Sequence, residues 1–403
     1  MNTRNMAAFA THGAALGTAQ SAASCDTRSN LRVEVLCDYK AAEAVWRDLE
    51  TRSDTTVYQR YDWARIWYET LAPVEGASPF IVIGHIGHQP AFLLALSSMR
   101  RKGSKVVRFI GGKHANICLP LVAEDRIAQI DTQTLKDALL QAGRTEGVDL
   151  YHIGHQPYRH ADRDNPFAAF DKVVETAPYF ETPLSADFEA FSREKRGRDG
   201  LKKLRYKRKK LQELGNLVTK RPETFEEMEQ VVETFLEQKA GRMQDGYHRN
   251  AFEDEGAADF LRVLARESFE NGSNLLDFHA LWLGDTIIAT FAGGLGNRQY
   301  SCSVNSIALD EEVMRHSPGD IILADVLKDL CEDGLERFDL GVGEAIYKRK
   351  WCEARTMFET FYALTPKGAA VGALMRSRSV IREWLKTYPP LFRLAHRVLN
   401  LVS

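Results

Sequence analysis

The spacing of apolar residues changes along the chain and predicts a repeated order of elements. Apolar and polar residues alternate over residues 31–37, which is typical of a strand, and residues 61–71 place Trp63, Ile66 and Trp67 at helical spacing. The first half is predicted to run strand, two helices, three strands, helix and strand. Its ranges are 31–37, 41–49, 61–71, 80–86, 91–97, 105–110, 130–142 and 148–153.

The second half repeats this order after a stretch that contains several prolines. The pairs Gly284-Asp285 and Gly296-Asn297 have the two-residue form of tight hairpin turns, which predicts an antiparallel meander of three strands. The sequence therefore predicts a mixed α/β protein with largely antiparallel sheets and two tandem units. The ranges of the second half are 216–219, 224–238, 257–270, 276–283, 286–295, 299–308 and 337–340.

The turn Ser317-Pro318-Gly319 opens the helix that follows the second meander. The first amides of a helix have no partner within the helix, so this turn is predicted to bind an anion. The strand 337–340 follows, and a second predicted helix then carries Tyr347. Such a turn also starts ordinary helices, in which proline suits the first position. The first half has no such turn, so we infer that only the second unit kept an anion site.

Charge is distributed unevenly along a chain whose net charge is only -2. Eleven lysines and arginines lie between Arg193 and Lys210 against Glu194 and Asp199, which gives a local charge of +9. Such a run repels itself and forgoes intrahelical ion pairs, which favours an anionic partner over a merely solvated face. Only Tyr206 could stack on a base, so nucleic acid is the weaker choice of partner.

The six cysteines show no close pairing and no metal-ligand spacing, which predicts reduced thiols in a cytoplasmic protein. Residues 1–30 are predicted to be a disordered leader, and no stretch approaches the roughly 18 apolar residues of a membrane span. Residues 366–403 predict two basic amphipathic helices. They pack on their own domain or lie on an anionic membrane surface, which would make the protein membrane-peripheral.

Three short motifs in the second half together resemble the GNAT acyltransferase superfamily. They are residues 315–319 (Arg-His-Ser-Pro-Gly), residues 338–343 (Phe-Asp-Leu-Gly-Val-Gly) and residues 347–351 (Tyr-Lys-Arg-Lys-Trp). The sequence resembles the acetyltransferase domain of proteins associated with cellulose or exopolysaccharide biosynthesis, which are relatives of the tandem-domain Fem-type aminoacyl transferases. The resemblance covers residues 190–365 well and residues 31–185 only as a pattern.

The resemblance implies a donor site for acetyl-CoA or another acyl-CoA, with the pyrophosphate on helix amides. Tyr347 is expected to return a proton to the leaving thiolate, and a backbone amide of residues 299–308 to hold the oxyanion. The general base is left open between Asp339, Glu344 and His279. The expected cofactor-binding residues are Arg315, Ser317, Pro318, Gly319 and Asp320, and the expected acceptor-binding residues are Lys348, Trp351 and Tyr300.

The resemblance also implies a division of the chain and a function. The function is transfer of an acyl group to an amine or hydroxyl of a small or sugar acceptor, in polysaccharide or cell-envelope biosynthesis, without a metal. Two alternatives stay open: aminoacyl transfer from charged tRNA, and a non-catalytic binding module of a polysaccharide-synthesis assembly. The predicted divisions are 1–30 (leader), 31–185 (degenerate GNAT-like unit), 186–215 (basic bridging helix), 216–365 (catalytic GNAT unit) and 366–403 (C-terminal helices).

Overall fold

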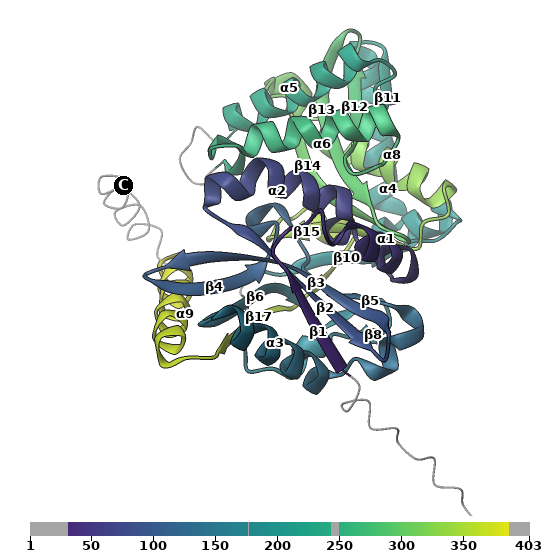
Figure 1. Ribbon diagram of the computed structural model, residues 1–403. Coiled ribbons are helices and arrows are strands. Elements are labelled where there is room, and N and C mark those ends of the chain that lie inside the picture. Colours follow the sequence, from purple (N-terminus) through teal and green to yellow (C-terminus); the bar gives the residue numbers. More distant parts are fainter. Residues whose placement is uncertain (1–30, 176, 243–249, 387–403) are drawn as a thin grey trace, which may run out of the picture.

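The computed structural model describes residues 31–175, 177–242 and 250–386 as two large mixed β-sheets with helices packed against them, together with a small two-stranded sheet (Figure 1). The predicted leader and the second predicted C-terminal helix lie outside the described residues. The mixed α/β class and the two units in tandem, predicted from the order of elements, are confirmed. Within the described ranges, no helix combines the length and the apolar character needed to cross a bilayer.

The first sheet has the strand order β1-β2-β3-β4-β6-β17-β9, with β5 paired to β3. Its strands are antiparallel neighbours except β4 and β6, which run parallel. The elements of this half are β1 (Leu31–Leu36), α1 (Glu43–Arg52), α2 (Tyr61–Glu75), β2 (Ser78–Ile86), β3 (Gln89–Arg101), β4 (Ser104–Phe109), β5 (Leu121–Val122), α3 (Thr132–Glu146), β6 (Leu150–Pro157), β7 (Arg159–His160), β8 (Arg163–Asp164) and β9 (Lys172–Val174).

The second sheet has the strand order β11-β12-β13-β14-β15-β10-β16. The meander β12-β13-β14 is antiparallel, as the two predicted hairpin turns require. The elements are β10 (Tyr179–Pro183), α4 (Phe188–Leu214), β11 (Leu217–Lys220), α5 (Phe225–Arg242), α6 (Ala257–Asn271), β12 (Asp277–Leu283), β13 (Thr286–Leu295), β14 (Gln299–Ile307), α7 (Glu311–Met314), α8 (Pro318–Glu332), β15 (Arg337–Val342), β16 (Glu353–Arg355), β17 (Met357–Ala363) and α9 (Pro366–Lys386).

Each half of the chain contributes one strand to the sheet of the other half. Strand β10 lies before residue 185 in the sequence, yet it pairs with β15 in the second sheet. Strand β17 lies before residue 365, yet it pairs with β6 in the first sheet. The predicted divisions at these two positions therefore do not follow the sheets. The alternation of apolar and polar residues in a short strand fixes only which of its faces is buried. It does not indicate which sheet or which neighbouring strand it pairs with.

The two units also share a hydrophobic core. Helices α2 and α6 lie side by side between the sheets (Figure 1), and Trp63 of α2 meets Phe260 of α6 edge to face at 5.4 Å between ring centroids. Tyr58 packs against Trp63 in the same manner at 5.5 Å. Aromatic side chains bury large apolar areas, so the Trp63–Phe260 contact helps to hold the two units in one arrangement, and Tyr58 supports Trp63 from within the first unit.

One predicted helix differs from what the structure shows. Tyr347 precedes a single 3-10 turn, Lys348–Lys350, instead of opening a helix, because the chain leaves the turn at once to form β16 against β10.

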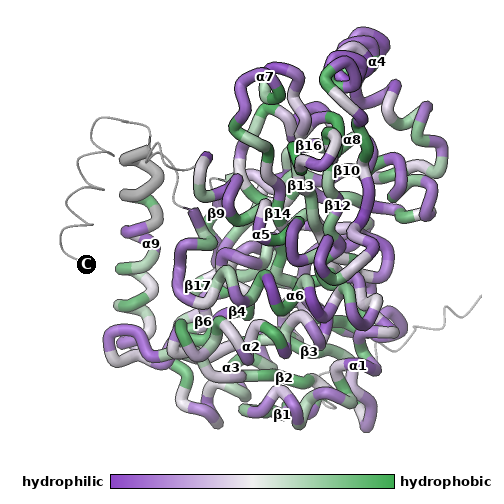
Figure 2. The backbone as a smooth tube through the Cα atoms, turned by 90° about the horizontal axis from the view of Figure 1, so that it is seen from above, coloured by the Kyte–Doolittle hydropathy of each residue, from purple (hydrophilic) through white to green (hydrophobic). Residues whose placement is uncertain are grey.

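The helix predicted to begin at residue 366 is present as α9, which places Val371 with Phe361 in a small core on the first sheet. The described part of this helix therefore packs against the protein itself, which is one of the two predicted alternatives. The helix lies at one side of the molecule (Figure 2).

Candidate functional site

A cavity of about 220 Å³ lies between the β13–β14 hairpin and the N-terminus of α8. Four of the residues predicted for the site line it together. These are Ser317, Gly319, Asp320 and Tyr347. The sequence did not single out other members of the lining, among them Arg242, Asn305 and Lys350.

The N-terminus of α8 is open, whereas the N-terminus of α3 in the first unit is closed. Ser317 at the N-cap has left-handed backbone angles (φ 51°, ψ 63°) and forms no side-chain cap hydrogen bond. Asp131 at the N-cap of α3 accepts a hydrogen bond from the Thr134 amide at 2.8 Å. A carboxylate at that position also repels an incoming phosphate. Anion binding at a helix N-terminus is therefore favoured in the second unit only.

Positive charges surround the start of α8. The Asp320 carboxylate accepts two hydrogen bonds from Arg196, at 2.9 and 3.0 Å, and one from Lys350 at 3.1 Å. Burial alone would raise the pKa of Asp320, but the hydrogen bonds and charge of Arg196, with those of Lys350, outweigh it and lower the pKa. Asp320 therefore stays ionised and holds these cations in place, so its side chain is not itself a phosphate ligand.

Lys207 of α4 reaches the same turn. Its Nζ donates to the Ser317 hydroxyl at 2.7 Å, and burial lowers the pKa of the lysine. Three cations, Arg196, Lys207 and Lys350, thus face the single carboxylate of Asp320 at the open end of α8. The excess positive charge and the free helix amides make this end of the cavity suitable for a phosphate or pyrophosphate.

Strands β14 and β15 separate beside the cavity. Their parallel pairing covers only Gln299–Ser301 against Arg337–Asp339. On the other edge of β14 the pairing with β13 skips one residue, Ser303, which marks a β-bulge. A bulge redirects backbone groups and is often found next to an active site. Backbone amides of β14 are thereby released from regular pairing in the strand predicted to hold the oxyanion.

The Tyr347 phenol lies at the same cavity. Its oxygen accepts a hydrogen bond from Asn305 Nδ2 at 3.2 Å, and the side chain is half-buried. Burial raises the pKa of the phenol well above its ordinary value. Tyr347 is therefore a neutral phenol at physiological pH and holds a proton that it can donate.

Asp339 is fully buried and does not line the cavity. Its carboxylate accepts from the Gly341 amide at 3.0 Å and from Gln299 Nε2 at 2.7 Å. Burial raises the pKa of Asp339 to about 6, although hydrogen bonds from Ser301, Gln299 and the Gly341 amide oppose the rise. This geometry assigns Asp339 to joining β14 and β15 and does not favour a role as the base.

The three residues predicted to bind the acceptor are buried outside the cavity. Trp351 stacks on Phe191 at 6.1 Å and lies under the Arg196 guanidinium at 5.1 Å. The hydroxyl of Tyr300 donates to the Asp277 carbonyl at 3.2 Å. The Nζ of Lys348 donates to two carbonyls at the end of β15, at 3.0 and 3.3 Å. The structure thus gives all three roles in packing or backbone support.

The remaining predicted residues also lie away from the cavity lining. Arg315 is exposed at the end of α7, and Pro318 is buried as the first residue of α8. Glu344 is exposed and paired with Arg349 at 2.7 Å. His279 is buried within β12, and burial lowers its pKa to about 4. Neither of these two base candidates contacts the cavity.

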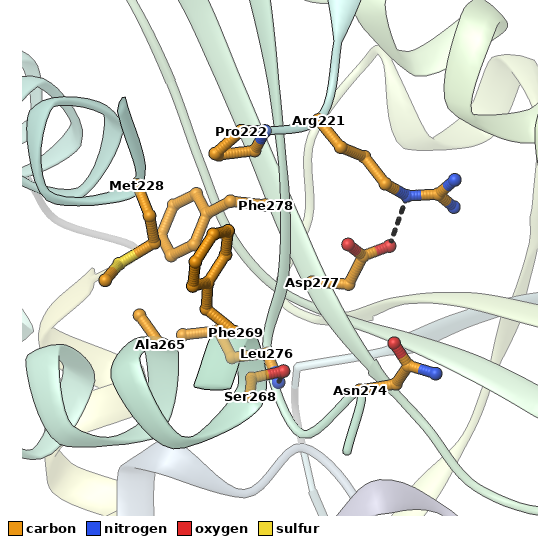
Figure 3. Close-up of a pocket in the computed structure, with 10 residues that line it drawn as sticks. All are labelled: Arg221, Pro222, Met228, Ala265, Ser268, Phe269, Asn274, Leu276, Asp277 and Phe278. Atoms are coloured by element: carbon orange, nitrogen blue, oxygen red, sulfur yellow. Dashed lines mark hydrogen bonds and ion pairs between the residues drawn. The ribbon is translucent and has the colours of Figure 1, made fainter. Parts of the chain in front are cut away.

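A second cavity, of about 160 Å³, lies near the start of β12 (Figure 3). Its charged residues neutralise each other, because Arg221 Nε donates to Asp277 Oδ2 at 3.0 Å. The opposite wall is apolar and is formed by Met228, Phe269 and Phe278. None of the predicted site residues lines this cavity. Across the part of the chain that the structure describes, no cluster of His, Cys, Asp and Glu is arranged to hold a metal ion.

Comparison with known proteins identifies a known domain in the second unit. Residues 198–349 match the family model described as the acetyltransferase (GNAT) domain, so the chain contains a GNAT-type acetyltransferase domain. No curated protein sequence matches the chain. The domain match supports an acyltransferase.

Two solved structures are similar in fold. The crystal structure of FemX is 9% identical, with a TM-score of 0.56 over 82% of this chain and 97% of that one. The C-terminal domain (DUF2156) of a putative lysylphosphatidylglycerol synthetase from Agrobacterium fabrum is 12% identical, with a TM-score of 0.50 over 85% of this chain and 96% of that one. At these identities the similarity shows the fold alone.

Proposed function

We propose that the protein transfers an acyl group from acetyl-CoA or another acyl-CoA to an amine or hydroxyl acceptor. One observation carries this proposal: the open N-terminus of α8, Lys350, residues 305–307 of the bulged strand β14 and the Tyr347 phenol line one cavity. Arg196 and Lys207 contact the same end of α8 from outside the lining. The cations suit the phosphates of the donor, and the strand and the phenol suit the two charges that form when a thioester is attacked.

The residues of the cavity have distinct roles in this reaction. The acceptor nitrogen or oxygen forms a bond to the thioester carbon, and a β14 backbone amide at the bulge stabilises the negative charge on the carbonyl oxygen. The carbon–sulfur bond then breaks, and Tyr347 donates its proton to the departing thiolate. The proton of the acceptor leaves to water or to a base other than the three predicted ones, since Glu344, His279 and Asp339 lie outside the cavity.

The acceptor is proposed to be a small molecule or a sugar of polysaccharide or cell-envelope biosynthesis, in the cytoplasm or at the membrane surface. The motif resemblance of residues 315–351 supports this narrower assignment. A second candidate donor is charged tRNA, which Fem-type relatives use; the positive surface of α4 favours it. A purely binding role is disfavoured, because a phenol with a proton to donate and a bulged strand are features of a reacting site.

Replacing Lys207 tests whether the N-terminus of α8 binds the phosphates of the donor. We expect Lys207→Met to weaken coenzyme A binding by about tenfold or more, because a charge-assisted hydrogen bond to phosphate is lost. Lys209→Met is the matched control, since Lys209 lies two residues away on the same helix but is exposed. Equilibrium dialysis with labelled coenzyme A measures both. Equal affinities in the two variants would remove the phosphate assignment.

The outer face of α4 carries an exposed row of cations. Arg198, Lys202, Arg205 and Lys209 are spaced at four, three and four residues, so they follow one line along the helix. None of them forms an ion pair with a described residue. Figure 2 shows α4 as a hydrophilic helix at the edge of the molecule. We propose that this row binds an anionic partner, such as a negatively charged acceptor or membrane surface.

Charge reversal tests this surface. We expect the triple variant Lys202→Glu, Arg205→Glu and Lys209→Glu to weaken binding to anionic vesicles or acidic polysaccharide at low salt, with the effect fading as salt screens the charges. The matched control reverses the exposed residues Arg100 and Arg101 at the end of β3 and Lys102 in the turn that follows. If both triple variants bind every anionic probe equally, the row on α4 is only a solvated face.

A further inference from the structure

Residues 115–119 pass between the two sheets and contact both; we call this segment the strap. Asn116 forms hydrogen bonds with the second sheet, and the Cys118 amide donates to the His155 carbonyl of the first sheet at 3.0 Å. Gln59 Nε2 donates to the Ile117 carbonyl at 3.2 Å and holds the middle of the strap. Four of the five strap residues are buried.

The Asn116 side chain spans the separation between β14 and β15. Its Nδ2 donates to the Cys302 carbonyl of β14 at 2.9 Å, and its Oδ1 accepts from the Val342 amide of β15 at 3.3 Å. These strands no longer pair with each other beyond Ser301. The asparagine amide thus occupies the place where a backbone amide would continue the sheet, and it supplies the same donor and acceptor.

The surroundings of Asn116 are built for this contact. Its Nδ2 also donates to the Tyr58 hydroxyl at 2.8 Å, so both of its donor hydrogens have partners. Gly341 has a left-handed φ of 68°, and a Cβ at this position would lie 2.5 Å from Asn116 Nδ2. Any larger residue at 341 would collide with the amide group, so the close approach requires glycine here.

Cys302 is the residue directly before the bulge at Ser303. A peptide unit is planar, so holding the Cys302 carbonyl also fixes the direction of the Ser303 amide. The proposed function places the oxyanion on this part of β14. Asn116 therefore acts on the bulge from a different unit of the protein, without lining the cavity itself.

We propose that Asn116 is a positioning residue of the transfer reaction, which sets the bulged backbone of β14 in the geometry that stabilises the oxyanion. The strap transmits the position of the first unit to the catalytic strand, so the docking of the two units and the assembly of the reacting site are one event. The proposal rests on the acyltransferase function proposed above. It also gives the first unit a function, which is to complete the site of the second.

The same strap closes the corresponding separation in the first unit. There the parallel strands β4 and β6 pair only over Val106–Val107 against Leu150–Tyr151. Beyond that point Cys118 bonds to β6 through its amide and accepts a hydrogen bond from Gln156 Nε2. The strap is thus anchored by backbone to the first unit while its one asparagine side chain reaches the second, as a positioning role requires.

Two variants of Asn116 and one control test the proposal. Asn116→Ala removes the bridge, and Asn116→Asp keeps its shape but loses the donor to the Cys302 carbonyl. The control is Asn297→Ala, because Asn297 Nδ2 also donates to two carbonyls across the interface of the units, those of Ser53 at 2.5 Å and Glu50 at 3.1 Å, and does not line the cavity. Turnover, the half-saturating acyl-CoA concentration and the melting temperature are measured in the full chain.

We expect both Asn116 variants to lower kcat by about tenfold or more while the half-saturating acyl-CoA concentration stays within about twofold, since only transition-state stabilisation is lost. Asn297→Ala should change neither. Equal kcat losses in Asn116→Ala and Asn297→Ala, or an unchanged kcat in a folded Asn116→Asp, would overturn the positioning role. Absence of turnover and of coenzyme A binding in the wild-type chain would instead reject the proposed function.

Discussion

Replacing Tyr347 with phenylalanine should lower turnover by at least about tenfold to a hundredfold and leave acyl-CoA binding nearly unchanged. Positioned general-acid catalysis contributes about a hundredfold to ten-thousandfold, and the substitution removes only the hydroxyl that carries the proton. The ring remains and keeps its packing at the cavity wall. Raised by burial, the pKa of the phenol keeps the proton on Tyr347 across the neutral pH range in which the donor is consumed.

The donor itself provides a control for this prediction. A thioester whose thiol has a low pKa needs little help from an acid, so it should recover much of the turnover lost in Tyr347→Phe. Tyr300→Phe is the matched variant, because that phenol is buried outside the cavity and donates to the Asp277 carbonyl. Turnover of Tyr347→Phe equal to that of the parent with a natural acyl-CoA would make the Tyr347 hydroxyl structural.

Replacing Arg196 with methionine should lower the free energy of unfolding by about 3 kcal/mol, because it leaves Asp320 buried with Lys350 as its remaining charged partner. The side chains of Arg196 and Asp320 are only 6% and 4% exposed. The control is Arg349→Met, whose pair with Glu344 is 58% and 51% exposed, so that solvent screens it and its loss should change stability little. Urea denaturation measures both variants.

The pH dependence of the Arg196 effect has a definite sign. The pKa of Asp320 is lowered in the folded protein, so the stability it contributes is present above its unfolded pKa of about 4 and is lost as the pH falls through the folded pKa. The difference between the parent and Arg196→Met should therefore shrink below about pH 4. Adding Asp320→Asn to Arg196→Met should restore part of the stability at neutral pH. An Arg196→Met variant as stable as Arg349→Met would show that the buried pair contributes little.

The sequence predicts the local elements of this fold well because the signals that define them are local. The hairpin turns at Gly284 and Gly296, the helix opened by Pro318 and the meander strands all follow from turn chemistry and periodicity. The exchange of β10 and β17 between the sheets could not be predicted. The strands with which a short strand pairs depend on tertiary packing, which the pattern of one strand does not contain.

The sequence predicts part of the site for the same reason. Ser317, Gly319, Asp320 and Tyr347 belong to motifs, and the structure brings them to one cavity. Polar or aromatic residues near the end of a strand look alike whether buried or facing a ligand, so Asp339 could not be assigned in advance.

Other residues of the site lack a sequence signal of their own. Arg196 and Lys207 are part of the basic run, but the sequence does not say which of its side chains turn inward toward α8. Asn116 and Asn305 lie outside every motif, because their roles depend on contacts between strands far apart in the chain.

The central claim is that the cavity at α8 binds an acyl-CoA donor, and titration of the full chain with coenzyme A in a calorimeter tests it most directly. The account predicts one saturable site per chain, with affinity reduced in Lys207→Met and retained in Lys209→Met. Absence of saturable binding in the folded parent would contradict the account. If charged tRNA then bound in a ribonuclease-sensitive manner, the donor would be the aminoacylated RNA instead.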